Sequence, residues 1–149
     1  MSHILFKKPN KDTYSVRVCV EANPEVELQK IKDTLDPDAY LLSPSDIPSH
    51  RKFRNAWIRP LSKQGIEVDV SKAKEIHLDR IRRMRDKKLK DLDVEMLKNI
   101  TNSKKLKEID AEKQLLRDIP QTIDLSNLDL NSPESLWPVE LELCLEYCK

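Results

Sequence analysis

The chain of 149 residues is long enough for one compact domain with an appended helical segment. Hydrophobic residues make up 38% of it and charged residues 36%, and the net charge is +1. An average globular domain has about 45–50% hydrophobic and about 25% charged residues, so the core of this chain is expected to be thin. The single glycine, Gly65, excludes the glycine-rich loops that bind nucleotide phosphates, and no apolar run reaches the roughly 18 residues of a membrane span.

The N-terminal residues carry the signals of a small sheet. Two β-rich runs, residues 3–7 and 14–20, flank a polar turn at residues 9–12 and predict an antiparallel hairpin. In the second run Tyr14 and the valines after it alternate with polar residues and a cysteine. The face of the strand that carries Tyr14 and the valines is therefore expected to be the apolar one. The alternation predicts a half-buried sheet.

A helix and a further strand follow. Asn23, with a proline and a glutamate directly after it, predicts a helix start, and Asp36-Pro37 ends the helix. Residues 39–42 are typical of a short strand. The sequence around Trp57 suits either a helical turn or a strand, and we assign this large apolar side chain to the core.

Two long helices separated by a polar break at residues 99–103 are predicted next. Asp69 and Ser71 are the expected caps of the first helix, and the second helix is expected to stop at Pro120. The simplest arrangement is an antiparallel helical hairpin. Apolar residues at spacings of three and four form one stripe on each helix. These residues are Leu78, Ile81, Met84, Leu89, Leu92 and Met96 on the first helix, and Leu106, Ile109, Leu115, Leu116 and Ile119 on the second.

The segment after Pro120 is predicted to be an irregular arm with one helical turn around residues 135–137. Trp137 in this arm either packs on the chain itself or docks on another molecule, and the sequence leaves both alternatives open. The predicted fold class is α+β. It consists of a small N-terminal β/α module (residues 1–70), the helical hairpin (71–120) and an acidic C-terminal arm (121–149).

Charge is distributed unevenly between the first helix and the arm. Residues 72–90 contain nine basic and three acidic residues, a net charge of +6, whereas residues 118–149 contain one basic and seven acidic residues, a net charge of −6. Opposite ends of one chain, or neighbouring copies, are therefore expected to attract one another at low ionic strength.

Four arginines of the first helix are candidate phosphate contacts: Arg80, Arg82, Arg83 and Arg85. Acidic residues are interspersed among them, and neither aromatic residues nor a short recognition helix accompany them. A solvated or protein-facing surface is the favoured interpretation. Glu75, Asp79 and Asp86 are expected to pair with nearby lysines and arginines three or four residues away.

No catalytic, metal or cofactor site is expected. The three histidines are far apart in the sequence, and His77, beside Asp79 and Arg80, is interpreted as a surface residue and not as a general base. None of them lies next to a serine or cysteine nucleophile.

The three cysteines are interpreted as buried or free thiols. Cys144 and Cys148 are four residues apart, and together with Cys19 they give only a weak zinc pattern. The odd number of cysteines and the absence of a long apolar run near the N-terminus predict synthesis in a reducing cytoplasm.

Residues 113–120 (KQLLRDIP), followed by Pro133 and by Leu136-Trp137-Pro138, resemble the C-terminal signature of bacteriophage tail assembly chaperones and tail-fibre assembly proteins. In that group a helix ending in a Leu-Arg-Asp-Ile-Pro-like run precedes a Trp-Pro. The similarity covers residues 47–138. The N-terminal β/α module and the acidic last dozen residues depart from the group's pattern, which also allows a component that stays in the particle.

The resemblance implies a non-enzymatic phage or prophage protein with a structural or assembly role and no cofactor. It implies that the chain binds other phage structural proteins, of the tail or capsid, or further copies of itself, in the host cytoplasm or within the virion. The alternative is a nucleic-acid-associated regulatory protein that uses the basic helix. The residues expected to contact a protein partner are Leu136, Trp137, Pro138, Arg117 and Asp118.

Overall fold

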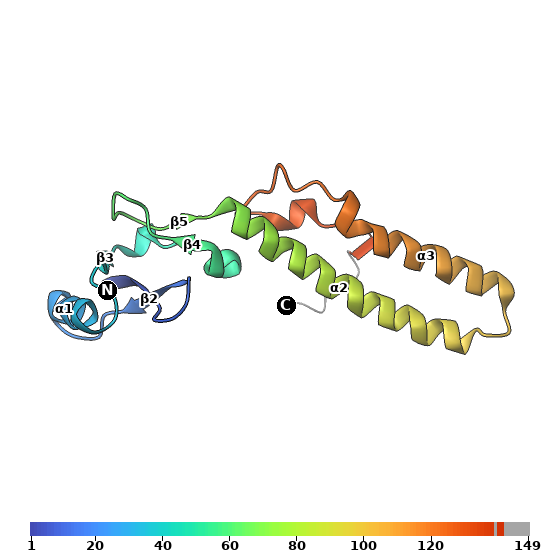
Figure 1. Cartoon of the computed structure of the whole chain (residues 1–149), viewed down its shortest axis with the longest axis horizontal. Helices are drawn as coiled ribbons and strands as arrows, with labels where there is room; N and C mark the ends of the chain where they lie inside the picture. Colours follow the sequence, from blue (N-terminus) through green and yellow to red (C-terminus); the bar gives the residue numbers. More distant parts are fainter. Residues whose placement is uncertain (139, 142–149) are drawn as a thin grey trace. The chain divides into compact units, whose positions relative to one another are not determined.

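The computed structural model describes residues 1–138, 140 and 141, and it has the predicted α+β architecture (Figure 1). The chain divides into two compact units, residues 1–73 and the residues from 74 onward. The helical hairpin and the described part of the arm belong to the second unit and share one hydrophobic core. None of the described helices is both long and apolar enough to cross a membrane.

A three-stranded antiparallel sheet lies at the centre of the first unit. The strand order is β2-β1-β3, so the first strand is central. The predicted hairpin of the first two strands is confirmed, with Leu5 opposite Val16. The strands are β1 (His3–Lys7), β2 (Tyr14–Val18) and β3 (Tyr40–Leu42).

Helix α1 (Pro24–Thr34) packs on one face of this sheet. It begins as predicted, because the side chain of Asn23 accepts a hydrogen bond from the backbone N–H of Glu25 at 3.1 Å and a proline occupies the first turn. The core between helix and sheet consists of Ile4, Leu28, Ile31 and Ala39.

The face of β2 that was predicted to be apolar is not the face that α1 covers. Ser15 is 6% exposed and Arg17 pairs with the buried carboxylate of Glu27 at 2.8 Å, whereas Val18 is 45% exposed. Arg17 lies opposite Ile4 in the register, and opposite residues share a face of the sheet. Helix α1 covers the face of Ile4, so the polar residues of β2 lie under the helix and are accommodated there by the ion pair.

Two short strands, β4 (Trp57–Ile58) and β5 (Glu67–Val68), form a second antiparallel sheet. A 3₁₀ segment, Arg51–Ala56, leads directly into β4, so the sequence that suited a helical turn or a strand forms both in succession. Trp57 is 3% exposed, which confirms that it is an interior residue. Gly65 has a φ of +73°, and the only glycine of the chain thus lies where the backbone requires the left-handed region.

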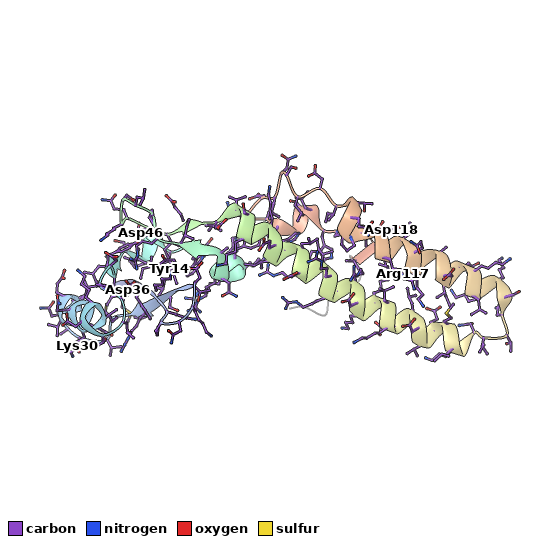
Figure 2. All side chains as sticks on the ribbon, viewed as in Figure 1. Tyr14, Lys30, Asp36, Asp46, Arg117 and Asp118 are labelled. Atoms are coloured by element: carbon purple, nitrogen blue, oxygen red, sulfur yellow. The ribbon has the colours of Figure 1, made fainter. Side chains whose placement is uncertain are left out.

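A largely buried ion pair connects several elements of the first unit. The guanidinium group of Arg59 pairs with the carboxylate of Asp36, and their side chains are 14% and 8% exposed. The same carboxylate accepts a hydrogen bond from the backbone N–H of Lys7 at 2.7 Å. Arg59 also lies 5.3 Å from the centre of the Tyr14 ring; Tyr14 and Asp36 are labelled in Figure 2. Polar contacts thus supplement the thin apolar core.

Helices α2 (Val70–Lys98) and α3 (Ser103–Thr122) form the predicted antiparallel hairpin, as Figure 1 shows. Asp69 caps α2 as predicted, because its carboxylate accepts a hydrogen bond from the backbone N–H of Lys72 at 3.1 Å. Asn102 caps α3 in the same way, through the backbone N–H three residues later, also at 3.1 Å.

Helix α3 does not stop at Pro120, where the sequence predicted its end, but continues to Thr122. A proline cannot donate to the carbonyl four residues before it, but only the last turn of the helix is affected here. The Thr122 hydroxyl donates to the carbonyl of Asp118 at 3.2 Å, and the backbone N–H of Ile123 donates to the carbonyl of Ile119 at 3.0 Å. The proline removes only the backbone donor to the carbonyl of Leu116, and the hydrogen bonds after it continue the helix to Thr122.

The core of the second unit lies between α2 and α3 and includes residues of the arm. Both predicted apolar stripes contribute to it, but the half-buried Leu78 and Leu106 and the 59% exposed Leu115 are not among its residues. The buried residues are Ile81, Met84, Leu92, Ile109, Leu116, Ile119 and Leu141, and the partly buried residues packed against them are Leu89, Met96, Ile123 and Trp137.

Candidate partner-binding groove

A groove with a volume of about 520 Å³ lies between the C-terminal part of α3 and the arm that follows it. Its lining is mostly apolar. Helix α3 contributes four residues at spacings i, i+3, i+4 and i+7, which share one face of a helix. The lining residues are Leu115, Asp118, Ile119 and Thr122 from α3, and Ile123, Ser135, Leu136, Trp137, Pro138 and Glu140 from the residues after it.

Four of the five residues predicted to contact a partner line this groove, although they come from segments that are separated in the sequence. These are Asp118, Leu136, Trp137 and Pro138. The fifth, Arg117, is exposed on α3 and is not among the lining residues; Figure 2 labels it beside Asp118. Whether these residues bind a partner stays a prediction.

Leu115 lines the groove but was assigned from the sequence to the core stripe of α3. It is 59% exposed, whereas its neighbour Leu116 is fully buried. Successive residues of an α-helix point about 100° apart, so two adjacent leucines cannot both face a narrow core. The Leu115-Leu116 pair was therefore the signal that one of the two faces another surface.

The arm is fixed to the hairpin at the C-terminal end of the groove-lining residues. As predicted, it contains one helical turn, the 3₁₀ helix η3 (Pro133–Leu136). The ammonium group of Lys88 on α2 donates a hydrogen bond to the backbone carbonyl of Glu140 at 2.7 Å. Leu141 is fully buried in the hairpin core. These contacts hold the groove in shape without a partner.

The interpretation of His77 as a surface residue was wrong, since it is only 1% exposed. Its imidazole ring meets the indole of Trp137 edge to face, with the ring centroids 5.7 Å apart and an interplanar angle of 72°. His77, Ile81 and Met84 are spaced i, i+4 and i+7 and lie on the buried face of α2. This spacing outweighs the two charged neighbours on which the sequence interpretation depended.

Trp137 has two environments, which corresponds to the two alternatives that the sequence left open. It packs against the hydrophobic core of the hairpin, and it also lines the groove. Its indole Nε1 is buried and has no hydrogen-bond acceptor among the residues that the structure describes. The ring therefore packs the arm against the hairpin core, and part of its surface lines the groove.

The chain segment that forms most of the groove is acidic. Residues 118–141 contain five acidic residues and no lysine or arginine. Asp118 accepts a hydrogen bond from the amide of Gln114 at 3.1 Å, and no ion pair neutralises Asp118 or Glu140 within the described part of the chain. Nearby, hydrogen bonds from the hydroxyl and backbone N–H of Ser126 lower the pKa of Asp124 and keep it charged. The groove thus combines a mostly apolar lining with carboxylates that no described ion pair neutralises.

The four arginines considered as phosphate contacts differ in their environments. Arg82 and Arg83 are exposed, whereas Arg80 and Arg85 are half-buried. Four helical residues at positions i, i+2, i+3 and i+5 are spread around the helix and do not form one stripe. A continuous track for a phosphate backbone is therefore absent from this quartet.

Acidic residues of the same helix also neutralise part of this cluster. Arg82 pairs with Asp79 at 3.1 Å, at the predicted spacing of three residues. Arg85 pairs with Asp86 at 2.7 Å, so pairing is confirmed for these two carboxylates, but the second pair joins adjacent residues. The exposed pairs leave fewer uncompensated charges for phosphates than the sequence suggests.

Within the described residues, no group of three histidine, cysteine, aspartate or glutamate side chains is placed to hold a metal ion. Cys19 is a free, partly buried thiol at the edge of the α1 core. Burial, and next the carboxylate of Glu27, raise the pKa of Cys19, so the thiol is kept protonated. Cys144 and Cys148 lie outside the described residues.

The fold and the groove together define an α+β protein in which a helical hairpin and a C-terminal arm form a mostly apolar groove that includes two carboxylates. No known protein family, no curated protein and no solved structure matches the chain.

Proposed function

We propose that this protein is a non-enzymatic bacteriophage or prophage structural or assembly protein that acts by holding a protein partner in the groove beside α3. The groove is the observation that supports a binding role. It brings Leu136, Trp137 and Pro138 next to Asp118, which are residues that the resemblance to tail assembly proteins singles out. The phage class rests on that resemblance alone.

A protein segment suits the groove better than a nucleic acid does. The lining is mostly apolar, with one tryptophan and two leucines, and it carries the carboxylates of Asp118 and Glu140, which repel phosphates. Buried aromatic anchors surrounded by leucines and polar groups are typical of the centre of protein interfaces. The expected partners are structural proteins of the tail or capsid, or further copies of this chain, in the host cytoplasm or in the particle.

The test is capture of the tagged full-length chain from a lysate of its native host during phage production, followed by mass spectrometry. We expect tail or capsid proteins to co-elute with it. Leu136→Asp places a charge in the groove and is expected to abolish the co-elution. Leu61→Asp changes a fully exposed leucine outside the groove and should leave it unchanged. Co-elution of the same proteins with both variants would refute the groove as the binding surface.

Analysis of purified particles separates the two versions of the role. A protein that stays in the particle is present in purified virions in a fixed stoichiometry with the tail or capsid proteins. An assembly chaperone is required for particle formation but is missing from purified particles.

The rival role, nucleic-acid binding, predicts steeply salt-dependent association with DNA or RNA. Charge reversal at Arg82, Arg83 and Arg85 would then abolish binding, whereas Leu136→Asp would not affect it. We expect no retention of DNA or RNA by the purified protein at low salt. Retention that depends on these arginines would support the nucleic-acid-binding role and refute the role that we propose.

A further inference from the structure

We infer that the occupant of the groove is the tip of the helical hairpin of a second copy of this chain, bound head to tail. The inference rests on the proposed binding role of the groove and names the partner. Three features carry it: an exposed apolar patch at the tip, opposite charges on tip and groove, and a hairpin geometry that keeps a tip away from its own groove.

The tip patch consists of Val94, Leu97 and Ile100. These side chains are 51%, 70% and 67% exposed, and they follow one another three residues apart at the end of α2 and in the connecting turn. Residues three apart on a helix are neighbours on its surface. Three adjacent exposed aliphatic side chains are notable in a chain with so little apolar material, because they are not available to the core.

Lysines surround the tip patch. Residues 94–107 contain four lysines and one acidic residue, a net charge of +3. The acidic residue, Glu95, is paired with Lys105 at 3.3 Å. Lys98, Lys104 and Lys107 are exposed and form no ion pair with any described residue. The tip therefore offers apolar side chains bordered by uncompensated positive charge.

The groove offers the complementary surface. It is mostly apolar and includes Asp118 and Glu140, within a segment, residues 118–141, that has five acidic residues and no lysine or arginine. Contact between two tips would bring like charges together, and so would contact between two grooves. Opposite charges favour only the pairing of a tip with a groove.

A tip cannot reach the groove of its own chain. The groove begins at Leu115 on α3, and the tip lies at the other end of the same helix, which begins at Ser103. At a rise of 1.5 Å per residue, the two points are separated by roughly 18 Å of continuous helix. The contact is therefore between two chains.

A tip-to-groove contact is heterologous, because each copy uses a different surface. Each bound copy still has one free tip or one free groove, so further copies can add. Such contacts produce rings or open filaments, which is the kind of assembly expected of a structural protein of a tubular or ring-shaped particle.

The test uses two complementary variants of the full-length chain, in size-exclusion chromatography with light scattering at low salt. Leu97→Asp disables the tip, and Leu115→Lys disables the groove by placing a cation among its acidic residues. Both positions are exposed, so neither change removes a core residue. Circular dichroism verifies that both variants are folded.

We expect the unmodified protein to form dimers and larger species as its concentration rises, and each variant alone to remain monomeric. An equimolar mixture of the two variants is expected to form dimers and nothing larger, because one intact tip meets one intact groove. Leu61→Asp, outside both surfaces, should associate as the unmodified protein does. High salt should weaken every association.

A monomer at every concentration, or failure of the mixed variants to dimerise, would overturn the inference. Neither outcome affects the proposed function, which depends on capture of tail or capsid proteins. Conversely, tip-to-groove dimers that capture no phage protein would support the inference and refute the phage role.

Discussion

The indole ring of Trp137 meets the imidazole ring of His77 edge to face, with centroids 5.7 Å apart. The contact joins the C-terminal arm to the N-terminal part of α2. Leu136 and Pro138, on either side of Trp137 in the sequence, line the groove. The position of these groove residues therefore depends on a buried aromatic contact between the arm and the hairpin.

Replacement of His77 tests this dependence. We expect His77→Ala to loosen the arm and to shift the fluorescence of Trp137 toward that of an exposed indole, measured in a Trp57→Phe background. The edge-to-face contact itself contributes about 0.5–1.5 kcal/mol beyond the area that it buries. His77→Phe keeps an aromatic ring at the site and should retain most of the native emission. Unchanged emission in His77→Ala would mean that the arm is held without this pair.

Trp137→Ala is expected to weaken partner binding more than it lowers the free energy of unfolding. A stability loss is also expected, because the ring packs against Ile81, Met84 and the rest of that buried cluster. Urea unfolding and the capture experiment measure the two effects. Equal losses in both would indicate that Trp137 only supports the arm and does not contact the partner.

Asp36→Asn is expected to destabilise the first unit by up to about 3 kcal/mol, because the mostly buried guanidinium of Arg59 then keeps only the exposed carboxylate of Asp38, at 3.4 Å, as a charge partner. Urea denaturation measures the change. Arg59→Met combined with Asp36→Asn should recover part of the loss, since no unpaired buried charge remains. As a control, Asp12→Asn removes an exposed ion pair with Lys7 and should change the stability little. A small effect of Asp36→Asn would show that the pair contributes little.

Leu116 and Leu115 are adjacent on α3 but lie in different environments, which gives a matched pair of truncations. Leu116→Ala removes a fully buried side chain and is expected to cost about 2–5 kcal/mol of unfolding free energy. Leu115→Ala, at a 59% exposed position, should cost well under 1 kcal/mol on the scale of surface substitutions. Similar costs for the two variants would contradict the orientation of α3.

Cys19 is expected to react slowly with iodoacetamide at mildly alkaline pH, because burial raises the pKa of its thiol and lowers the fraction of thiolate. A raised pKa means that this group favours the folded state when it is protonated. That contribution is fully present below the pKa of the unfolded state and is lost as pH rises through the pKa of the folded state. Peptide mapping by mass spectrometry isolates Cys19 from the other cysteines, and urea-unfolded protein provides the reference rate.

Local patterns were sufficient to predict most of the secondary structure. The hairpin of β1 and β2, the capping of α1 by Asn23 and of α2 by Asp69, and the antiparallel pair of long helices all follow from interactions between residues close in the sequence. Hydrogen bonds at helix ends and apolar spacing act over a few residues, so a single sequence contains them.

Which face of each helix or strand is buried was less predictable. The covered face of β2, the burial of His77 and the exposure of Leu115 depend on which neighbouring element packs where. A charged neighbour indicates a surface position only on average, whereas the i, i+4, i+7 relation to Ile81 and Met84 places His77 on the buried face.

The sequence by itself determined the α+β class, the helical hairpin and the opposite charges of the basic helix and acidic arm, because composition and short-range periodicity are properties of the chain. Only the tertiary structure decided that Asp118 of α3 and Leu136, Trp137 and Pro138 of the arm line one groove. Their proximity results from the packing of Trp137 on His77 and the burial of Leu141 among the hairpin residues. Contacts between residues so far apart in the chain leave no periodic signal in one sequence.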